Sequence, residues 1–298
     1  MKIIDCTTYF NEPLLFEIRL NILNKYVDKF IVSEAIYTHS GNKKKINFNK
    51  NLFPKFKDKI EHLIIDKEPD GIVNVEKIDD SNNSLFRLNA AKRIEFQRNE
   101  ILRAVKSFSP NDWIIYSDSD EIPDLSKIDL KSSKFNYILF NQKVFYYKFN
   151  LILPSHNWFG SKACKKKNIS SISNLRNLKT KKYKWWRLDT LFRKDKLINV
   201  KILDNGGWHF TEIKSPEEIY QKHKNDEHHD EFELTGITQN DVEEMVKNNY
   251  IPYDHQADGK DLSKKWNRDN RIKLIKVNDN QLPKYLTENK KNYKKWFV

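Results

Sequence analysis

The chain has 298 residues, of which 38% are hydrophobic and 13% aromatic, and it carries a formal net charge of +13. This composition can build a sizeable core, and no stretch approaches the roughly 20 apolar residues of a membrane-spanning helix. Because residues 1–5 also lack the apolar segment of a signal peptide, we expect a folded, soluble, cytoplasmic protein.

The first half of the sequence alternates between predicted strands and predicted helices. Apolar runs predict strands at residues 2–8, 29–35, 59–66 and 112–117. Helical spacing of apolar residues predicts helices at residues 13–23 and 85–108. This alternation is typical of a parallel sheet with right-handed crossovers.

The second half is predicted to continue the sheet and then to become helical. Residues 137–147 and 188–193 read as strands, with a loop rich in Lys and Asn between them. From Pro216 onward the pattern is helical and polar. Ser215 is the expected N-cap, because proline and two acids follow it in the first turn.

The segment at residues 113–123 is the most informative one. It is a short apolar strand that leads directly into three carboxylates and a proline. Asp118 and Asp120 would lie just beyond the carboxyl end of this strand, where open α/β sheets bind ligands. Their oxygens suit Mg²⁺ or Mn²⁺, and a metal with few protein ligands keeps positions open for substrate phosphates. An ordinary polar turn is the alternative.

Other polar side chains follow the predicted strands at the same edge of the sheet. They are Tyr9, Asn11 and Glu12 after the first strand and Glu34 at the end of the second. A nucleotide across this edge could have its base and ribose met by these loops, while a metal neutralises its diphosphate. Solvated loop polarity is the competing interpretation.

Two further positions are candidate ligand-binding residues. Arg93 and Arg98 are five residues apart on the long predicted helix, so we expect one of them to be solvated and prefer Arg98 as the binding residue. Pairing with a nearby acid such as Glu95 is the alternative. His209 follows two of the seven glycines, and it could be a metal ligand, a general base or a packed core residue.

The charge and the cysteines narrow the class of protein. The lysines lie in short scattered clusters without a zinc-finger or RRM signature, which argues against a dedicated nucleic-acid module. The basic surface favours anionic donors and a peripheral contact with acidic lipid head groups. Cys6 and Cys164 have no companion at metal-ligand spacing, so we expect buried thiols.

Four blocks of the sequence, in order, resemble glycosyltransferase family 17, the family of the bisecting β-1,4-N-acetylglucosaminyltransferase. They are residues 27–34 with Tyr37 and Thr38, the Asp-Ser-Asp-Glu-Ile-Pro motif at 118–123, Gly-Trp-His at 207–209 with 216–220 and Lys222, and residues 283–286 with Asn289. Their joint order makes the resemblance specific. Residues 66–85 and 151–184 match least, and there we expect acceptor recognition to vary.

The resemblance implies a GT-A type fold, which is an α/β fold with a Rossmann-like, mostly parallel central sheet flanked by helices and a helical C-terminal part. In one catalytic domain, residues 1–125 would form the nucleotide-sugar-binding half, 126–210 the acceptor-side half and 211–298 the helical part. The implied reaction is an inverting, metal-dependent transfer of N-acetylglucosamine from UDP-GlcNAc onto a glycan or glycolipid, with Mn²⁺ or Mg²⁺.

The resemblance also implies roles for particular residues. Asp118 and Asp120 would be the metal-binding pair, with Asp120 preferred as the direct ligand and His209 a further ligand by analogy with other GT-A enzymes. The nucleotide sugar would be met by Tyr9, Asn11, Glu12, Glu34, Arg98 and Asp118.

Inversion requires a base that deprotonates the acceptor hydroxyl. Asp189, beside aromatic residues that could stack on sugar rings, is the preferred candidate. Glu121 and Glu212 are rivals, and Glu121 could instead orient the site or cap the turn at Pro123.

Unlike the animal members of the family, the chain is expected to have no membrane anchor and no stem. We therefore expect a microbial or viral glycan acceptor, such as a lipid-linked or surface polysaccharide. Two other classes remain open, a basic nucleic-acid-binding protein and a metal-dependent hydrolase that uses the same carboxylates. The first would show nucleic-acid binding with a steep salt dependence. The second would release free sugar or phosphate without an acceptor.

Overall fold

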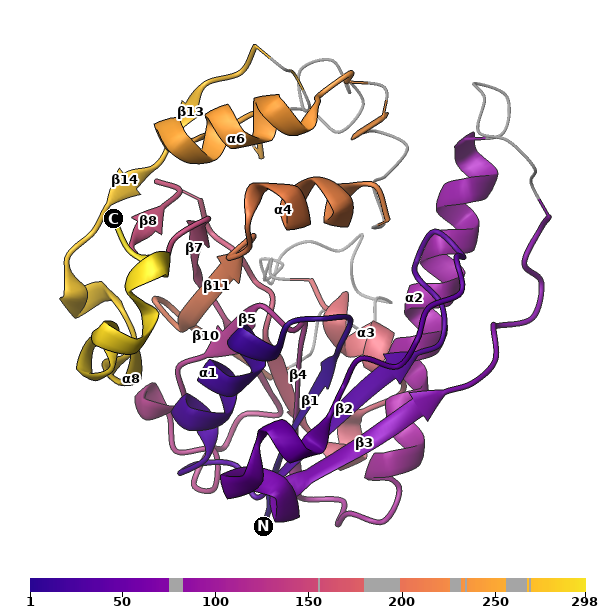
Figure 1. The fold of residues 1–298 in the computed structure, drawn as a ribbon. Helices are drawn as coiled ribbons and strands as arrows, with labels where there is room; N and C mark the ends of the chain where they lie inside the picture. The colour runs from indigo at the N-terminus through magenta and orange to yellow at the C-terminus, as the bar shows by residue number, and fades with distance from the viewer. Residues whose placement is uncertain are drawn as a thin grey trace, which may run out of the picture.

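The computed structural model describes residues 1–74, 83–154, 156–179, 199–225, 232–233, 235–255, 267 and 269–298. Its framework is a seven-stranded sheet in the order β10-β6-β9-β4-β1-β2-β3 (Figure 1). Helices cover both faces of this sheet, and a smaller five-stranded sheet stands beyond the carboxyl end of its central strand β4.

Four strands from the first half of the chain form the parallel part of the large sheet. They are β1 (Ile3–Thr8), β2 (Lys29–Ala35), β3 (Ile60–Ile65) and β4 (Trp113–Ser117). β1 lies between β2 and β4, and β3 extends the sheet beyond β2. Because their carboxyl ends meet at one edge, the loops after β1, β2 and β4 lie close together.

The other edge of the large sheet comes from the middle of the chain. β9 (Lys162–Lys165) runs antiparallel between β4 and β6 (Tyr137–Phe140), and β10 (Val200–Leu203) pairs parallel with β6. β9 is thus the one described strand of this sheet that reverses the common direction.

Helices α1 (Pro13–Leu23), α2 (Asn83–Val105) and α3 (Ile172–Arg176) cover the two faces of the large sheet. Ile3 packs into the cluster on the α1 face, whereas Ile4 and Cys6 pack into the cluster with α2 and α3. Since successive strand residues point to opposite faces, burial on both faces explains why β1 is apolar almost throughout.

The smaller sheet has the order β14-β8-β7-β11-β5. Its strands are β5 (Glu121–Pro123), β7 (Lys143–Tyr146), β8 (Leu151–Ile152), β11 (Gly207–Thr211) and β14 (Ile275–Lys276). β5 begins directly after the turn that carries Asp118 and Asp120, and it pairs antiparallel with β11 so that His209 lies opposite Glu121. This pairing brings a distant part of the chain to the end of β4.

The C-terminal part packs over the smaller sheet. Helix α4 (Pro216–His223) begins with a capping box in which Ser215 and Glu218 cap each other's backbone, and it packs against α6 (Gln239–Asn248). The remaining elements are β12 (Tyr250–Ile251), β13 (Ile272–Lys273), α8 (Lys284–Glu288), and the 3₁₀ segments Lys50–Leu52, Pro54–Lys59, Leu125–Lys127, Lys166–Asn168, Asp279–Gln281 and Lys290–Trp296. Helix α8 packs against α1, so both ends of the chain contribute to one core.

The expected fold class, an α/β GT-A type fold with a mostly parallel central sheet, is confirmed. The strands and helices predicted in the first half are present within a few residues of their expected bounds. The Ser215 cap and the buried, unpaired thiols of Cys6 and Cys164 are also confirmed. None of the helices in the described parts of the chain is both long and apolar enough to cross a membrane.

Two predictions for the second half are corrected. Residues 137–147 do not form one strand, because the chain turns at Asn141 and Gln142 and places β6 and β7 in different sheets. The region expected to be a loop contains β8, β9 and α3. The helical C-terminal part contains α4, α6 and α8 as expected, with short strands between them. The predicted strand at residues 188–193 lies outside the described residues.

Candidate active site

A cavity of about 300 Å³ opens at the carboxyl ends of β1, β2 and β4. Its wall combines residues that follow β1 and β4 with residues of α2, β11 and α4; among them are Tyr9, Glu12, Arg98, Asp118, Asp120, Trp158, His209, Glu212, Lys214 and Lys222. Open α/β sheets bind their ligands at such an edge. The cavity is therefore the candidate active site.

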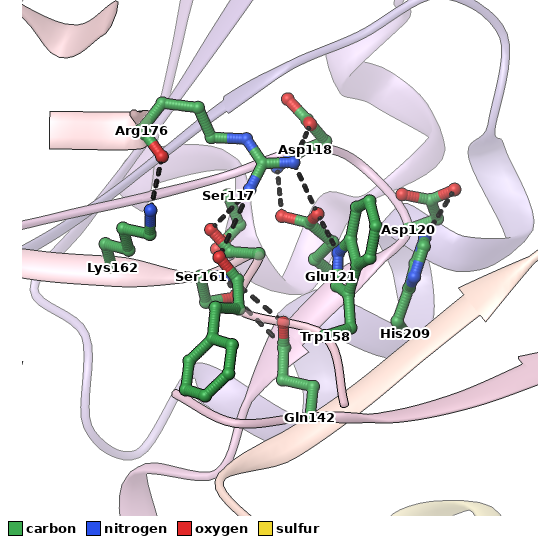
Figure 2. Close-up of polar contacts among 12 residues, drawn as sticks. Ser117, Asp118, Asp120, Glu121, Gln142, Trp158, Ser161, Lys162, Arg176 and His209 are labelled. Carbon is green, nitrogen blue, oxygen red and sulfur yellow. Dashed lines mark hydrogen bonds and ion pairs between the residues drawn. The ribbon is translucent and has the colours of Figure 1, made fainter. Parts of the chain in front are cut away.

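Asp118 is held by two arginines from different helices. Arg176 at the end of α3 donates to its Oδ2 at 2.8 Å (Figure 2). Arg98 of α2 lies 3.2 Å from Oδ1. Tyr116 also donates its hydroxyl to Oδ1 at 2.8 Å. Burial alone would raise the pKa of the Asp118 carboxyl, but the two guanidinium charges hold it well below its usual range. Asp118 is therefore a fixed anion at neutral pH.

Glu121 lies behind Asp118 and is only 1% exposed. Its carboxylate accepts hydrogen bonds from the Asp118 backbone N–H at 3.0 Å, Trp158 Nε1 at 2.6 Å and Arg176 at 2.9 Å (Figure 2). The carboxylate fits because residue 160 is glycine, where a Cβ would lie 2.1 Å from it. With its oxygens engaged in this way, Glu121 orients the turn, which was the alternative role expected for it, and its role as the base stays a prediction.

Asp120 faces a different group of partners. His209 on β11 places Nε2 3.5 Å from Asp120 Oδ2 (Figure 2). Lys222 of α4 lies 4.0 Å from the same oxygen. The ring of Trp158 stacks on the His209 ring with centroids 4.9 Å apart. Burial would raise the pKa of the Asp120 carboxyl, but His209 and Lys222 lower it below its usual value.

The donor atoms of Asp120 and His209 suit a divalent cation. Ligands at right angles around an ion with bonds of about 2.1 Å lie about 3 Å apart, so a separation of 3.5 Å is close to what two adjacent ligands need. The buried Nδ1 of His209 has no hydrogen-bond partner in the described structure. No group of three or more His, Cys, Asp or Glu residues suited to a metal occurs among the residues that the structure describes. The remaining ligands would have to come from substrate and water.

The predicted nucleotide-binding residues fall into two groups. Tyr9, Glu12, Arg98 and Asp118 line the cavity, whereas Asn11 is exposed and Glu34 is fully buried, and neither lines it. The carboxylate of Glu34 accepts hydrogen bonds from Lys44 and from two backbone N–H groups of the loop after β2. The prediction that Glu34 contacts a ligand directly is therefore corrected. Glu34 instead holds the loop that brings Lys44 to the cavity wall.

Of the two arginines of α2, Arg98 lies where it was predicted and Arg93 does not. Arg98 does line the cavity, and it pairs with Asp118 rather than Glu95. Arg93 is not solvated, because its side chain is 7% exposed and pairs with Glu68.

Sequence reasoning missed Trp158 and Arg176. Both come from the region that was expected to be a loop, and they reach the site through contacts with Glu121 that span 37 and 55 residues. Trp158 precedes Gly160, which was the only local signal of a close approach. The preferred base, Asp189, lies outside the described residues.

The sequence profile of glycosyltransferase family 17 matches residues 1–297. The chain is also similar to parts of solved structures, of which we name three. HddC from Yersinia pseudotuberculosis is 12% identical over 74% of this chain and 97% of its own, with a TM-score of 0.35. A glycosyltransferase involved in glycosylation of the major capsid of PBCV-1 is 13% identical over 68% of this chain and 82% of its own, with a TM-score of 0.31.

The third, 4-diphosphocytidyl-2C-methyl-D-erythritol synthase, is 10% identical over 74% of this chain and 96% of its own, with a TM-score of 0.36. No curated protein matches the chain by sequence.

Proposed function

The chain belongs to glycosyltransferase family 17 and is a glycosyltransferase, and from this premise we propose that it is an inverting, metal-dependent enzyme that transfers N-acetylglucosamine from UDP-GlcNAc to a glycan. One observation carries the proposal: Asp120 and His209 lie 3.5 Å apart beyond the carboxyl end of β4. Both line a cavity whose wall also contains several lysines. That is the charge pattern a nucleoside diphosphate and a divalent cation require.

Different residues of the cavity wall would bind different parts of the donor. Asp120 and His209 would hold Mn²⁺ or Mg²⁺, which when bound neutralises charge on the departing diphosphate. Lys222 and Lys214 add positive charge on the same wall. Tyr9 and Arg98 belong to residues 1–125, which we assign as the nucleotide-sugar half, and would meet the base and ribose.

In this proposal Asp118, which was predicted to share the metal with Asp120, supports the turn instead of contacting the metal. Its oxygens are shared between Arg98 and Arg176, which fix the turn and so fix the direction of Asp120. Because a catalytic group must be held to within a fraction of an ångström, such support contributes directly to rate.

The acceptor is expected to be a microbial or viral glycan, for example a lipid-linked or surface polysaccharide. The basic surface would bring the enzyme to an anionic membrane from the cytoplasmic side. An acceptor-side half at residues 126–210 and a helical part at 211–298 complete the proposed organisation.

A nucleotide-sugar panel tests the proposal. Calorimetric titration with UDP-GlcNAc and other UDP-, GDP- and CDP-sugars is expected to give binding that requires Mn²⁺ and is lost on chelation. Asp120→Asn should weaken that binding at least about tenfold, because it removes a charged metal ligand. Asp58→Asn, which changes an exposed carboxylate far from the cavity wall, is the matched control.

Product analysis separates the proposal from hydrolysis. A transferase releases UDP faster when a glycan acceptor is present, in step with a new glycosidic bond of inverted configuration, whereas a hydrolase releases free sugar or phosphate at the same rate with or without an acceptor. Absence of metal-dependent binding to every nucleotide sugar in the panel would overturn the proposal.

A further inference from the structure

A second cavity of about 220 Å³ adjoins the candidate active site between β11, α4 and α6. The two cavities share a wall that consists of Trp158, His209, Thr211, Glu212 and Lys222. A group bound in the second cavity would therefore meet a group bound beside Asp120 across this wall. That is the relation which two reacting substrates need.

The lining of the second cavity suits a sugar ring. Aromatic side chains form one side of the cavity. Tyr146 and His255 are joined there by a 2.7 Å hydrogen bond, and the ring centroids of Tyr253 and His255 are 4.5 Å apart. Aliphatic side chains, among them Val242 and Met245 of α6, form the other. Aromatic faces with a few polar groups are typical of sites for amphipathic ligands.

Glu212 is the carboxylate common to the two cavities among the residues that the structure describes. It follows β11 directly, with a φ of +56° that residues other than glycine seldom adopt. Such strained positions concentrate at functional sites. The side chain is 8% exposed, and its Oε1 lies 2.8 Å from His223 Nε2 on α4.

The other carboxylates of the first cavity are committed elsewhere. Glu12 accepts hydrogen bonds from two backbone N–H groups, Asp118 is paired with two arginines, and Glu121 is held by Trp158 and Arg176. Asp120 pairs with His209. None of these four lines the second cavity in the described structure.

Glu212 and Asp120 both line the first cavity, and Glu212 lines the second cavity together with Tyr146. If Asp120 holds the metal, Glu212 therefore lies in the wall of the cavity that contains the donor, and it also faces the adjoining cavity.

We propose that Glu212 is the general base of the transfer, that the second cavity holds the acceptor sugar, and that His223 is the positioning residue which orients Glu212. This inference rests on the proposed glycosyltransferase function. The acceptor hydroxyl gives its proton to the Glu212 carboxylate while its oxygen forms the new bond to the anomeric carbon. The bond from that carbon to the diphosphate oxygen breaks, and the electron pair leaves with UDP. The proton on Glu212 then passes to solvent.

The experiment uses UDP-GlcNAc with Mn²⁺ and measures UDP release, first with water as the acceptor and then with a panel of methyl glycosides. Calorimetry with UDP and Mn²⁺ measures donor-site binding separately. Glu212→Gln is expected to lower kcat at least about 100-fold, as loss of a general base does, while the Kd of UDP changes less than about threefold. Glu212→Asp should recover part of the rate. Glu217 is an exposed acid on the same helix as His223, so Glu217→Gln is the control and should keep the wild-type kcat.

Two further variants test the other parts of the inference. His223→Ala should lower kcat about tenfold without changing the Kd of UDP, and His223→Gln, which keeps an N–H for Glu212, should restore most of it. A merely structural role would lower stability in both. Tyr253→Ala should remove the stimulation of UDP release by methyl glycosides, while the Kd of UDP changes less than about threefold, because Tyr253 lines only the second of the two cavities.

The possible outcomes distinguish an error in the assignment of Glu212 as the base from an error in the proposed function. Failure of the wild-type protein to bind UDP with Mn²⁺ would contradict the proposed function and the base with it. Normal UDP binding with an unchanged kcat for Glu212→Gln would overturn the base alone. Normal UDP binding without release of UDP to water would also count against it, because a base placed in this way activates water as well as a sugar hydroxyl.

Discussion

Asp118 and Asp120 are one residue apart, yet their side chains belong to different networks. Asp118 is fixed from behind by Arg98, Arg176 and Tyr116, whereas Asp120 lies beside His209 in the cavity wall. Neutralising the first should therefore loosen the structure, and neutralising the second should remove binding. The two substitutions give separable measurements.

Asp118→Asn is expected to lower the free energy of unfolding by about 1–3 kcal/mol, because both arginines then lose a counter-charge and Arg176 keeps Glu121 but not Asp118. The pKa of Asp118 is lower in the folded chain than the usual value of about 3.9. Its stabilisation is thus present above about pH 4 and is lost as the pH falls below that value. Urea unfolding at pH 7 and at pH 3.5 should show a larger difference between wild type and variant at pH 7.

Asp58→Asn serves as the control for this comparison, since the exposed Asp58 should shift stability by less than about 0.5 kcal/mol at either pH. A variant difference that grows on acidification would contradict the assignment of Asp118 as the ionised partner of the two arginines.

Gly160 has a role that only the packed structure reveals. A methyl group there would lie 2.1 Å from the Glu121 carboxylate, which is held by Trp158 and Arg176 and has no room to move. Gly160→Ala is expected to cost about 1–3 kcal/mol of stability through overpacking and to weaken metal-dependent UDP binding. Thermal unfolding and calorimetry would check both effects. Full stability in this variant would show that Glu121 is not confined as described.

Strands β5 and β11 together position the candidate metal site. Their antiparallel register places His209 opposite Glu121, and the backbone N–H of Phe210 donates to the Asp120 carbonyl at 2.8 Å. The turn with the two aspartates is therefore joined to β11 by backbone hydrogen bonds. Any change in how the strands approach each other should move His209 relative to Asp120.

Gly207→Ala tests this coupling. Gly207 has a φ of +145°, and a Cβ there would lie 2.2 Å from the backbone oxygen of Ile122, which cannot move without shifting β5. We expect a loss of several kcal/mol in unfolding free energy and of Mn²⁺-dependent UDP binding. Gly236→Ala is a matched control, because Gly236 also has a positive φ, +65°, but no atom within 4 Å of an added Cβ, so it should cost only about 1 kcal/mol. Equal losses in the two variants would contradict the coupling.

Elements buried on both faces could be predicted from the sequence, and elements defined by distant partners could not. β2 and α1 have the bounds expected from their apolar runs. β6 and β7 read as one strand because both are apolar and only Asn141 and Gln142 separate them. Their division into two sheets depends on pairing with β9 and with β11.

The site shows the same limit. Asp118 and Asp120 stand in a local motif and were found from it. Arg176 lies 58 residues from Asp118, and no local pattern connects them. Glu34 shows the opposite error, since an acid at a strand end suggested a ligand contact and proved to bind its own loop.

At the scale of the whole molecule, the net charge of +13 remains larger than the cavity explains. Part of it lies in the 3₁₀ segment Lys290–Trp296, where Lys295 lies 5.0 Å from the Trp296 ring and Lys290 5.0 Å from the Phe297 ring. The aromatic side chains of this segment pack into or against the core, and the lysines that surround them give a basic surface that suits an anionic membrane.

We therefore expect the protein to bind vesicles that contain phosphatidylserine and to ignore neutral phosphatidylcholine vesicles. Each lysine near the membrane surface contributes about 1 kcal/mol, and the attraction is screened over about 10 Å at 0.1 M salt, so binding should be strong near 0.05 M salt and lost near 0.5 M.

Co-sedimentation with the vesicles measures this binding. The double variant Lys294→Glu, Lys295→Glu should weaken binding at least tenfold, whereas Lys55→Glu, Lys57→Glu, an equal change of charge at exposed positions in the first half of the chain, should weaken it less. Equal loss in the two double variants would make the attraction a property of net charge alone. Salt-sensitive binding to duplex DNA that exceeds vesicle binding and survives Asp120→Asn would instead show that the basic surface of this glycosyltransferase prefers nucleic acid to membranes.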